Sequence, residues 1–275
     1  MAAVEMRIDR LNFDSAGDYH HIQSFSIGHE TCVLKFFQII QHTDLLAFAK
    51  EQIKTGIPVR ILTPFVPERH LDAMEDIMGK IFNQECFENS MIIVNDLGLM
   101  NYIFRIDPKR QMCLGRSLSV CFDYAPWGCK IYEDESSQIQ DVVSQISFYD
   151  DEKMEFYKRY NVTEIEANVT ENTTESLKSI QKAGFKVNVH QTTFLYGIQR
   201  SCYIKRCHEH YTCSGTECDY PKQIELDTLW DNTGFFEATE DVDFPSPLYL
   251  QGNQIYGKTH NIPLDWADRI IVGSE

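Results

Sequence analysis

Four cysteines and two histidines lie within seventeen residues, CYIKRCHEHYTCSGTEC, at positions 202–218. Cysteine thiolates and imidazoles are ligands that proteins offer to zinc and to iron–sulfur clusters. Zinc sites usually take cysteines in closely spaced pairs from tight turns, and the spacing C-x4-C-x5-C-x4-C is looser. A cubane cluster accepts more varied spacing and one remote ligand. The segment therefore favours a 4Fe–4S cluster, with zinc or a group of non-ligating thiols as the alternatives.

The other cysteines bear on the redox state of the chain. The total is nine, an odd number, and the five before residue 202 are scattered. The N-terminal stretch MAAVEMRIDRLNFDS lacks the apolar core of a secretory signal. No apolar run approaches the roughly 20 residues that span a bilayer. We therefore expect a cytoplasmic protein without a membrane span, whose cysteines are thiols or metal ligands rather than disulfides.

Acidic residues dominate the charge of the chain. The 41 Asp and Glu residues against 25 Lys and Arg give a formal net charge of −16. Nucleic-acid binding over a broad surface needs clustered Lys and Arg, so bulk nucleic-acid binding is not expected. The balance favours a small-molecule, lipid-like or peptide substrate.

Short apolar runs alternate with amphipathic stretches through the first 196 residues. Strands are expected at 21–28, 58–66, 91–96, 111–118, 162–169 and 186–196, and helices at 33–56, 69–82, from 97, 136–146 and 173–184. This alternation predicts parallel strands joined by right-handed helical crossovers. We therefore expect an α/β fold with a (β/α) barrel, complete or incomplete, over residues 1–200.

The remaining chain has a different character. We expect residues 201–220 to form a Cys-rich iron–sulfur segment. Residues 221–275 contain short, aromatic, extended stretches interrupted by Pro245 and Pro247. We expect them to form a small β-rich extension packed on the barrel.

Ligands of parallel barrels bind where the carboxyl ends of the strands converge. The residues expected at those ends are 29–32, 63–65, 95–96, 116, 166–168 and 190–193. Cys32 ends the first expected strand, and Cys202 follows the last one by six residues. Because the first and last strands of a closed barrel are neighbours, we expect Cys32 beside the cysteine segment. The alternative is a small buried residue at a strand end.

Three residues of this mouth are weak catalytic candidates. Asp96 could orient a substrate, but Asn-Asp-Leu-Gly at a strand-to-helix junction is also ordinary N-cap chemistry. Glu166 could act as an acid or base, or it could pair with Arg116. His190 could be a catalyst, or a histidine whose hydrogen bonds are satisfied at a strand end.

Several motifs, in this order and at these strand ends, resemble the collagenase-like peptidase family. Within it they are most similar to the UbiV type of oxygen-independent ubiquinone-biosynthesis proteins. The motifs are FSIGHETC (25–32), ILTPFVPE (61–68), NDLGLMNYI (95–103), CLGRSLSV (113–120) and RSCYIKRC (200–207). The resemblance runs from about residue 20 to the end of the chain.

The resemblance implies a barrel that carries an oxygen-sensitive 4Fe–4S cluster. It implies Cys32, Cys202, Cys213 and Cys218 as ligands, with Cys207 as an additional cysteine that could replace Cys32 or Cys213. It further implies a component of an oxygen-independent hydroxylation system that works with a homologous cluster-bearing partner. Four cysteine ligands leave no open iron position, so the cluster would transfer electrons or stabilise structure.

A second class of function remains as the alternative. The chain has neither a G-x-S-x-G elbow nor an H-E-x-x-H zinc helix. A peptidase-like hydrolase would therefore need a less regular set of residues. The other form of this alternative is a non-catalytic barrel in which a structural zinc ion fastens the C-terminal part to the barrel.

Overall fold

The computed structural model describes residues 2–9, 14, 19–121, 134–148, 150–199, 202, 224–225, 247–259 and 261–273. Eight parallel strands form a closed barrel in the order β1-β12-β7-β6-β5-β4-β3-β2. They are β1 (Ala3–Ile8), β2 (Ser24–Gly28), β3 (Val59–Leu62), β4 (Ile92–Val94), β5 (Met112–Leu114), β6 (Val162–Ala167), β7 (Lys186–His190) and β12 (Arg269–Gly273). The α/β barrel predicted from the alternating pattern is confirmed, and it is complete.

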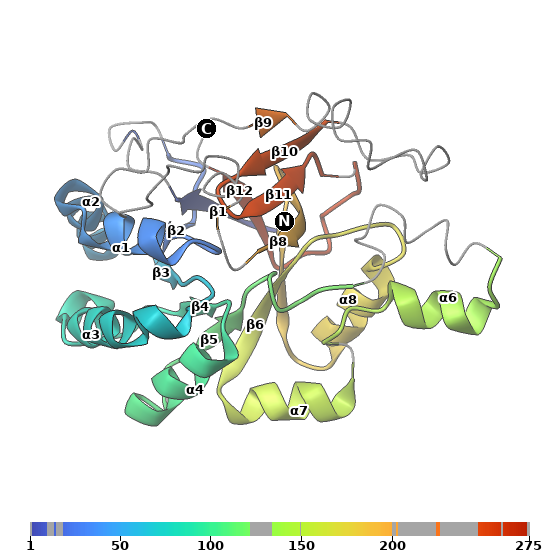
Figure 1. Cartoon of the computed structure of the whole chain (residues 1–275), viewed down its shortest axis with the longest axis horizontal. Helices are drawn as coiled ribbons and strands as arrows, with labels where there is room; N and C mark the ends of the chain where they lie inside the picture. The colour runs from blue at the N-terminus through green and yellow to red at the C-terminus, as the bar shows by residue number, and fades with distance from the viewer. Residues whose placement is uncertain are drawn as a thin grey trace.

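Helices follow most of the barrel strands and lie around the outside of the barrel (Figure 1). They are α1 (Val33–Gln41), α2 (Thr43–Lys54), α3 (Leu71–Phe82), α4 (Leu97–Ile106), α6 (Ser137–Ser144), α7 (Asp151–Arg159) and α8 (Thr174–Lys182), with short 3₁₀ turns at Glu68–His70 and Glu85–Phe87. The helix expected over 33–56 is two helices, because the backbone at His42 is extended. Helix α7 was not predicted from the sequence, because Met154 is its one buried residue and no apolar periodicity marks the helix. No described helix is long and apolar enough to cross a bilayer.

Strands β1 and β12 were also not predicted from the sequence. Strand β1 carries the buried charged residues Glu5 and Arg7, whereas a strand buried on both faces usually reads as an apolar run. Both strands lie between β2 and β7 in the closed barrel. The expectation that the strand before Cys32 adjoins the strand over 186–196 is therefore wrong.

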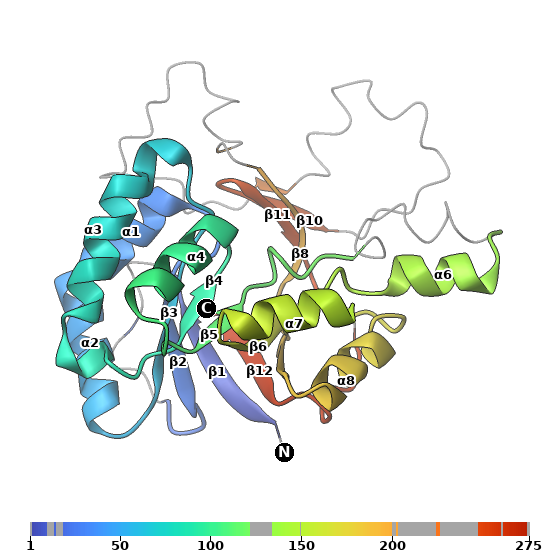
Figure 2. The same ribbon diagram turned by 90° about the horizontal axis from the view of Figure 1, so that it is seen from below.

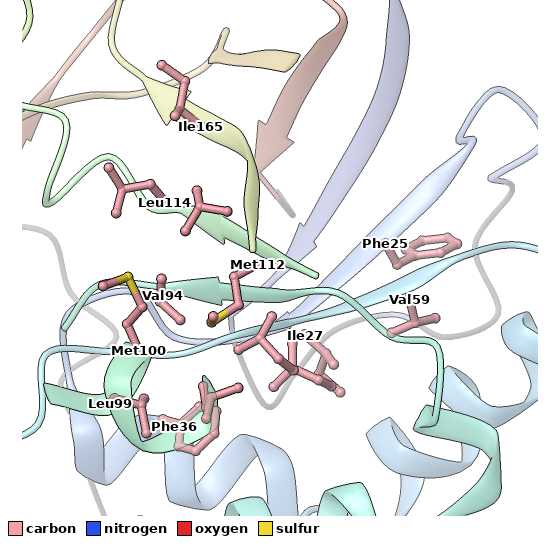
Figure 3. Packing of buried hydrophobic residues seen from close by; sticks show 14 of the residues in the cluster. Phe25, Ile27, Phe36, Val59, Val94, Leu99, Met100, Met112, Leu114 and Ile165 are labelled. Carbon is pink, nitrogen blue, oxygen red and sulfur yellow. The ribbon is translucent and has the colours of Figure 1, made fainter. Parts of the chain in front are cut away.

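The outward faces of the strands form the main hydrophobic core with the helices. Ile27 of β2, Val94 of β4 and Leu114 of β5 belong to one buried cluster with Phe36 of α1 and Leu99 of α4 (Figure 3). Fully burying one side chain of this size stabilises the fold by about 1.5–3 kcal/mol. This layer supports a barrel whose inward faces can carry polar groups.

The inward faces are rich in polar and charged side chains. Successive residues of a strand point to opposite faces, and the residues that alternate with the core are Glu5, Arg7, Ser24, Ser26, Arg60, Glu164, Glu166, Asn188 and His190, all buried. Contacts between strands that are not neighbours, such as Arg60 of β3 with Glu164 of β6, show that these side chains cross the barrel interior. A small separate apolar cluster is formed by Leu62, Ile93 and Cys113.

A four-stranded antiparallel sheet is inserted between β7 and β12. Its order is β8-β11-β10-β9, with β8 (Phe194–Ile198), β9 (Ile224–Glu225), β10 (Leu248–Gln251) and β11 (Gln254–Gly257). The strand expected over 186–196 divides into β7 and β8, and β8 leaves the barrel at the carboxyl end of β7. In Figures 1 and 2, strands β8, β10 and β11 lie together, apart from the layer of helices. The small β-rich unit expected near the C-terminus is confirmed, and β12 returns from it into the barrel.

Candidate functional site

A cavity of about 70 Å³ opens at the carboxyl ends of the barrel strands. Its lining comprises Arg7, Asp9, Glu30, Arg116, His190, Thr192, Thr193, Ile271 and Gly273 around the barrel, and Gln251, Gln254 and Tyr256 of the small sheet. Glu30, Arg116 and His190 belong to the mouth expected from the sequence. Arg7 was missed because β1 was not identified. The sheet residues were missed because only the tertiary fold places that sheet over the mouth.

Five buried side chains beside this cavity form a continuous chain of ion pairs and hydrogen bonds. Arg116 Nη2 donates to Glu30 Oε1 at 2.6 Å, and Arg7 Nη1 donates to Glu30 Oε2 at 3.3 Å. Arg7 Nη2 donates to both carboxylate oxygens of Glu166, at 2.7 and 2.8 Å. His190 Nε2 lies 3.2 Å from Glu166 Oε2. Each charged group in the chain therefore has an opposite charge beside it.

The partner of Glu166 differs from the one considered from the sequence. Glu166 pairs with Arg7 of β1, whereas Arg116 pairs with Glu30 and also donates to the carbonyl oxygen of Thr193 at 2.8 Å. The pairing of Glu166 with Arg116 is therefore wrong. The reason is that Arg7 reaches the barrel interior on a strand that the sequence pattern did not reveal.

Burial and neighbouring charges act against each other in this chain. Burial disfavours the charged form of Arg7, but the carboxylates of Glu166 and Glu30 outweigh it and raise the Arg7 pKa above its ordinary value. Burial likewise raises the pKa of Glu30, but Arg116 and Arg7 outweigh it and hold that pKa at about 2. Both residues are therefore ionised at neutral pH, so the cavity wall carries fixed, mutually compensated charges.

His190 is the neutral member of the chain. Burial, together with the positive charges of Arg116 and Arg7, lowers the pKa of His190 well below its ordinary value. A neutral imidazole has one N–H group and one acceptor nitrogen. Because the carboxylate of Glu166 faces Nε2, the proton lies on Nε2 and Nδ1 is the acceptor. His190 therefore contributes a neutral imidazole to the cavity wall, with its Nε2–H group held by Glu166.

We expect His190 to stay neutral, with its proton on Nε2, at pH values where an ordinary histidine becomes protonated. A histidine whose folded pKa is depressed contributes stability that is complete above the unfolded value of 6.5 and is lost as the pH falls toward the folded pKa. Below pH 6.5 this contribution should fall by up to about 1.4 kcal/mol per pH unit. Ring ¹⁵N chemical shifts and urea unfolding at several pH values would measure both effects. His190→Gln should remove this part of the pH dependence, and an imidazolium signal at pH 6 would contradict the assignment.

Asp96 lies at the N-cap of α4. Its Oδ1 accepts from the backbone N–H of Leu99 at 2.8 Å, and its Oδ2 accepts from the backbone N–H of Val66 at 3.3 Å. It does not line the cavity at the mouth. These contacts are those of the capping alternative, and the second one also holds the segment that follows β3.

The motif FSIGHETC has a local structural basis at each of its distinctive residues. Gly28 has a φ of +134°, and a Cβ atom there would lie 2.1 Å from the carbonyl oxygen of Leu62, so only glycine fits. His29 Nδ1 accepts from the backbone N–H groups of Thr31 and Cys32, at 3.2 and 3.0 Å. Cys32 is the N-cap residue of α1. The chain therefore turns sharply after β2 and presents Cys32 at the start of a helix.

The turn between β10 and β11 joins this segment to the one after β8. Asn253 Nδ2 donates to the carbonyl oxygens of Thr31 and Gln199, at 2.8 and 2.9 Å. The hydroxyl of Thr31 donates to Gln254 Oε1 at 3.4 Å. Side chains of the small sheet thus hold the end of the first motif and the start of the cysteine segment to one another.

Cys32 and Cys202 lie next to this same turn. Cys32 directly follows Thr31, and Cys202 Sγ lies 3.3 Å from the carbonyl oxygen of Gly252. Both cysteines are half-buried. They are therefore gathered at one end of the barrel by the turn of the small sheet, and not by adjacent barrel strands.

The other cysteines of the segment, Cys207, Cys213 and Cys218, lie outside the described residues. Within the described part of the chain, no group of three or more His, Cys, Asp or Glu side chains could hold a metal ion. Two of the four expected ligands therefore have a described position, and the complete ligand set stays a prediction.

Comparison with known proteins assigns no activity to this chain. No protein-family model matches the chain, and no curated protein matches it. Among solved structures, the chain is similar to the U32 peptidase Mk0906, of the collagenase-like family, at 10% identity and a TM-score of 0.49. The alignment covers 100% of this chain and 93% of that one. None of these comparisons identifies a site residue of this chain.

Proposed function

We propose that this protein is a 4Fe–4S component of an oxygen-independent hydroxylation system, with Cys32, Cys202, Cys213 and Cys218 as the cluster ligands. The observation that carries the proposal is the pair of hydrogen bonds from Asn253 to the segments that precede Cys32 and Cys202. Thr31 directly precedes Cys32, and Gln199 lies three residues before Cys202, so this arrangement supports a ligand set that combines the two cysteines.

The described cysteines suit a thiolate-bound cluster. Cluster ligands are deprotonated, and negative charge is favoured at the N-terminus of a helix, where Cys32 lies. Both cysteines are half-buried, which limits but does not prevent contact with solvent. The cluster would supply electron transfer, because four cysteine ligands leave no open iron position.

The residues of the mouth cavity would bind and orient the reacting part of the substrate. Arg7 and Arg116 are held by Glu166 and Glu30, so their positions are set before a substrate arrives. His190 would offer the substrate a neutral imidazole, while Glu166 holds its Nε2–H group. A cavity of about 70 Å³ admits only a small group, so the rest of a larger substrate would lie outside it.

A partner follows from the electron balance of such a reaction. When a C–H bond becomes C–OH with an oxygen atom from water, two electrons and two protons are released. A 4Fe–4S cluster carries one electron at a time, so the cluster of this chain and that of a homologous subunit would each take one, and an external electron acceptor would reoxidise both. The net charge of −16 favours a small-molecule, lipid-like or peptide substrate over nucleic acid. The odd number of cysteines, nine, disfavours a disulfide framework and suits the reducing cytoplasm.

The proposal is tested by anaerobic purification of the whole chain, followed by iron, acid-labile sulfide and zinc assays. About four iron and four sulfide per chain, with broad visible absorption that air bleaches, is the expected result. About one zinc per chain without sulfide would overturn it. That result would leave a barrel fastened by structural zinc, and a peptidase-like hydrolase would then be the alternative to test.

A further inference from the structure

A second and larger cavity, of about 340 Å³, opens at the opposite end of the barrel. It lies between the end of α2, the loop into β3, the segment before β4, and the amino ends of β3, β6 and β12. Its volume falls within the range of small-molecule sites. None of the residues that line it belongs to the mouth cavity or to the proposed ligand set.

The floor of this amino-end cavity is a layer of buried ion pairs. Arg60 donates from Nη1 to Glu5 Oε2 at 2.9 Å and from Nη2 to Glu164 Oε2 at 2.8 Å. Arg269 Nη1 donates to the same oxygen of Glu164 at 2.8 Å. Glu164 Oε2 therefore accepts from two arginines, and both Nη atoms of Arg60 already donate to carboxylates.

Arg269 is the more accessible of the two arginines in this layer. The ion pairs of the layer join Arg60, Arg269 and Lys186 to Glu5 and Glu164, and Arg60 Nη1 also lies 4.0 Å from Glu166 Oε1. The Arg269 side chain is 18% exposed, against 3% for Arg60. Within the described part of the chain, Arg269 Nη2 has no hydrogen-bond partner. Arg269 is therefore the floor residue that can still pair with an anion.

The walls of the cavity are largely apolar. Ile53 and Ile57 line it on one side, and Met91 lines it beside Arg60. Asn89 is an exposed residue of the rim. A ligand that suits this lining has a hydrocarbon body and one small anionic group.

We propose that the amino-end cavity binds a small monocarboxylate with an apolar body. Its carboxylate pairs with Arg269, and its hydrocarbon part packs against Ile53, Ile57 and Met91. The site is independent of the proposed cluster, because it lies at the other end of the barrel.

The first experiment compares three probes of equal length: hexanoate, hexanol and hexylamine. The full chain carries ¹³C-methyl methionine, and each probe is titrated while methyl resonances are followed. Hexanoate should shift Met91 in a saturable way and leave Met154, at the start of α7, unchanged. Hexanol and hexylamine should bind at least about tenfold more weakly, because neither has a carboxylate that can form a charged hydrogen bond with arginine. Equal binding of hexanol, stronger binding of hexylamine or no saturable shift would each overturn the proposal.

The second experiment changes the charge at the rim without touching the buried ion pairs. Asn89→Lys should tighten hexanoate binding by about threefold at low salt, and Asn89→Asp should weaken it by about the same factor. Both substitutions are at an exposed position, so both variants should fold. High salt should reduce both effects. Identical affinities of the two variants at low salt would show that the anion does not bind in this cavity.

Discussion

Cys32→Ala is expected to leave the anaerobically purified protein with little of its iron. Cys32 is the proposed remote ligand, and the turn around Asn253 holds its segment beside the start of the cysteine segment. Three thiolates bind a cubane cluster less firmly than four and leave one iron exposed. Iron and sulfide per chain, measured beside the unchanged protein, give the result directly.

Two other cysteine variants make this result specific. Cys86→Ala removes a half-buried thiol that lines the cavity at the opposite end of the barrel, so iron content should be unchanged. Cys207→Ala should also retain the cluster if Cys207 is the additional cysteine. Loss of iron in Cys207→Ala together with full iron in Cys32→Ala would mean that all four ligands come from the segment 202–218.

Arg60→Met is expected to destabilise the folded protein by about 3–5 kcal/mol, the usual cost of removing one partner from a buried ion pair. Arg60 is 3% exposed and holds both Glu5 and Glu164 inside the barrel. Methionine can occupy much of the same volume, so the loss is mainly electrostatic. The free energy of unfolding, from urea denaturation at neutral pH, measures it.

Lys186→Met is the matched control for this effect. Its ammonium group lies 3.7 Å from Glu164 Oε1, but its side chain is 64% exposed, so the change should stay within about 1 kcal/mol. Equal losses in the two variants would show that burial does not determine the contribution of these pairs.

The cost of Arg60→Met should also shrink at acid pH. Burial acts to raise the pKa of Glu164, but Arg60 and Arg269 outweigh it and hold that pKa below its ordinary value. Stability from this pairing is present above the unfolded pKa of the carboxyl group and is lost as the pH falls through the folded one. A protonated Glu164 no longer needs Arg60, so the variant and the unchanged protein should approach each other in stability. An unchanged difference at low pH would assign the loss to packing.

The motif around Cys32 shows how far local sequence reasoning reaches. The expectation that Cys32 lies near the cysteine segment rested on two barrel strands being neighbours, and they are not. The segments before Cys32 and Cys202 meet through Asn253, which belongs to a sheet that packs over the mouth. No periodicity in the sequence of Asn253 and its neighbours indicates that its amide group bridges two distant carbonyls.

Hydrophobic periodicity predicts the alternation of strands and helices, and with it the barrel. The spacing of apolar residues along the chain indicates local secondary structure, and it predicts six of the barrel strands and most of the helices. Only the tertiary structure decided which charges pair, because Arg7 and Glu166 are 159 residues apart and meet only when the barrel closes. For the same reason β1 stayed hidden: its charged residues become compatible with burial only once opposite charges from other strands surround them.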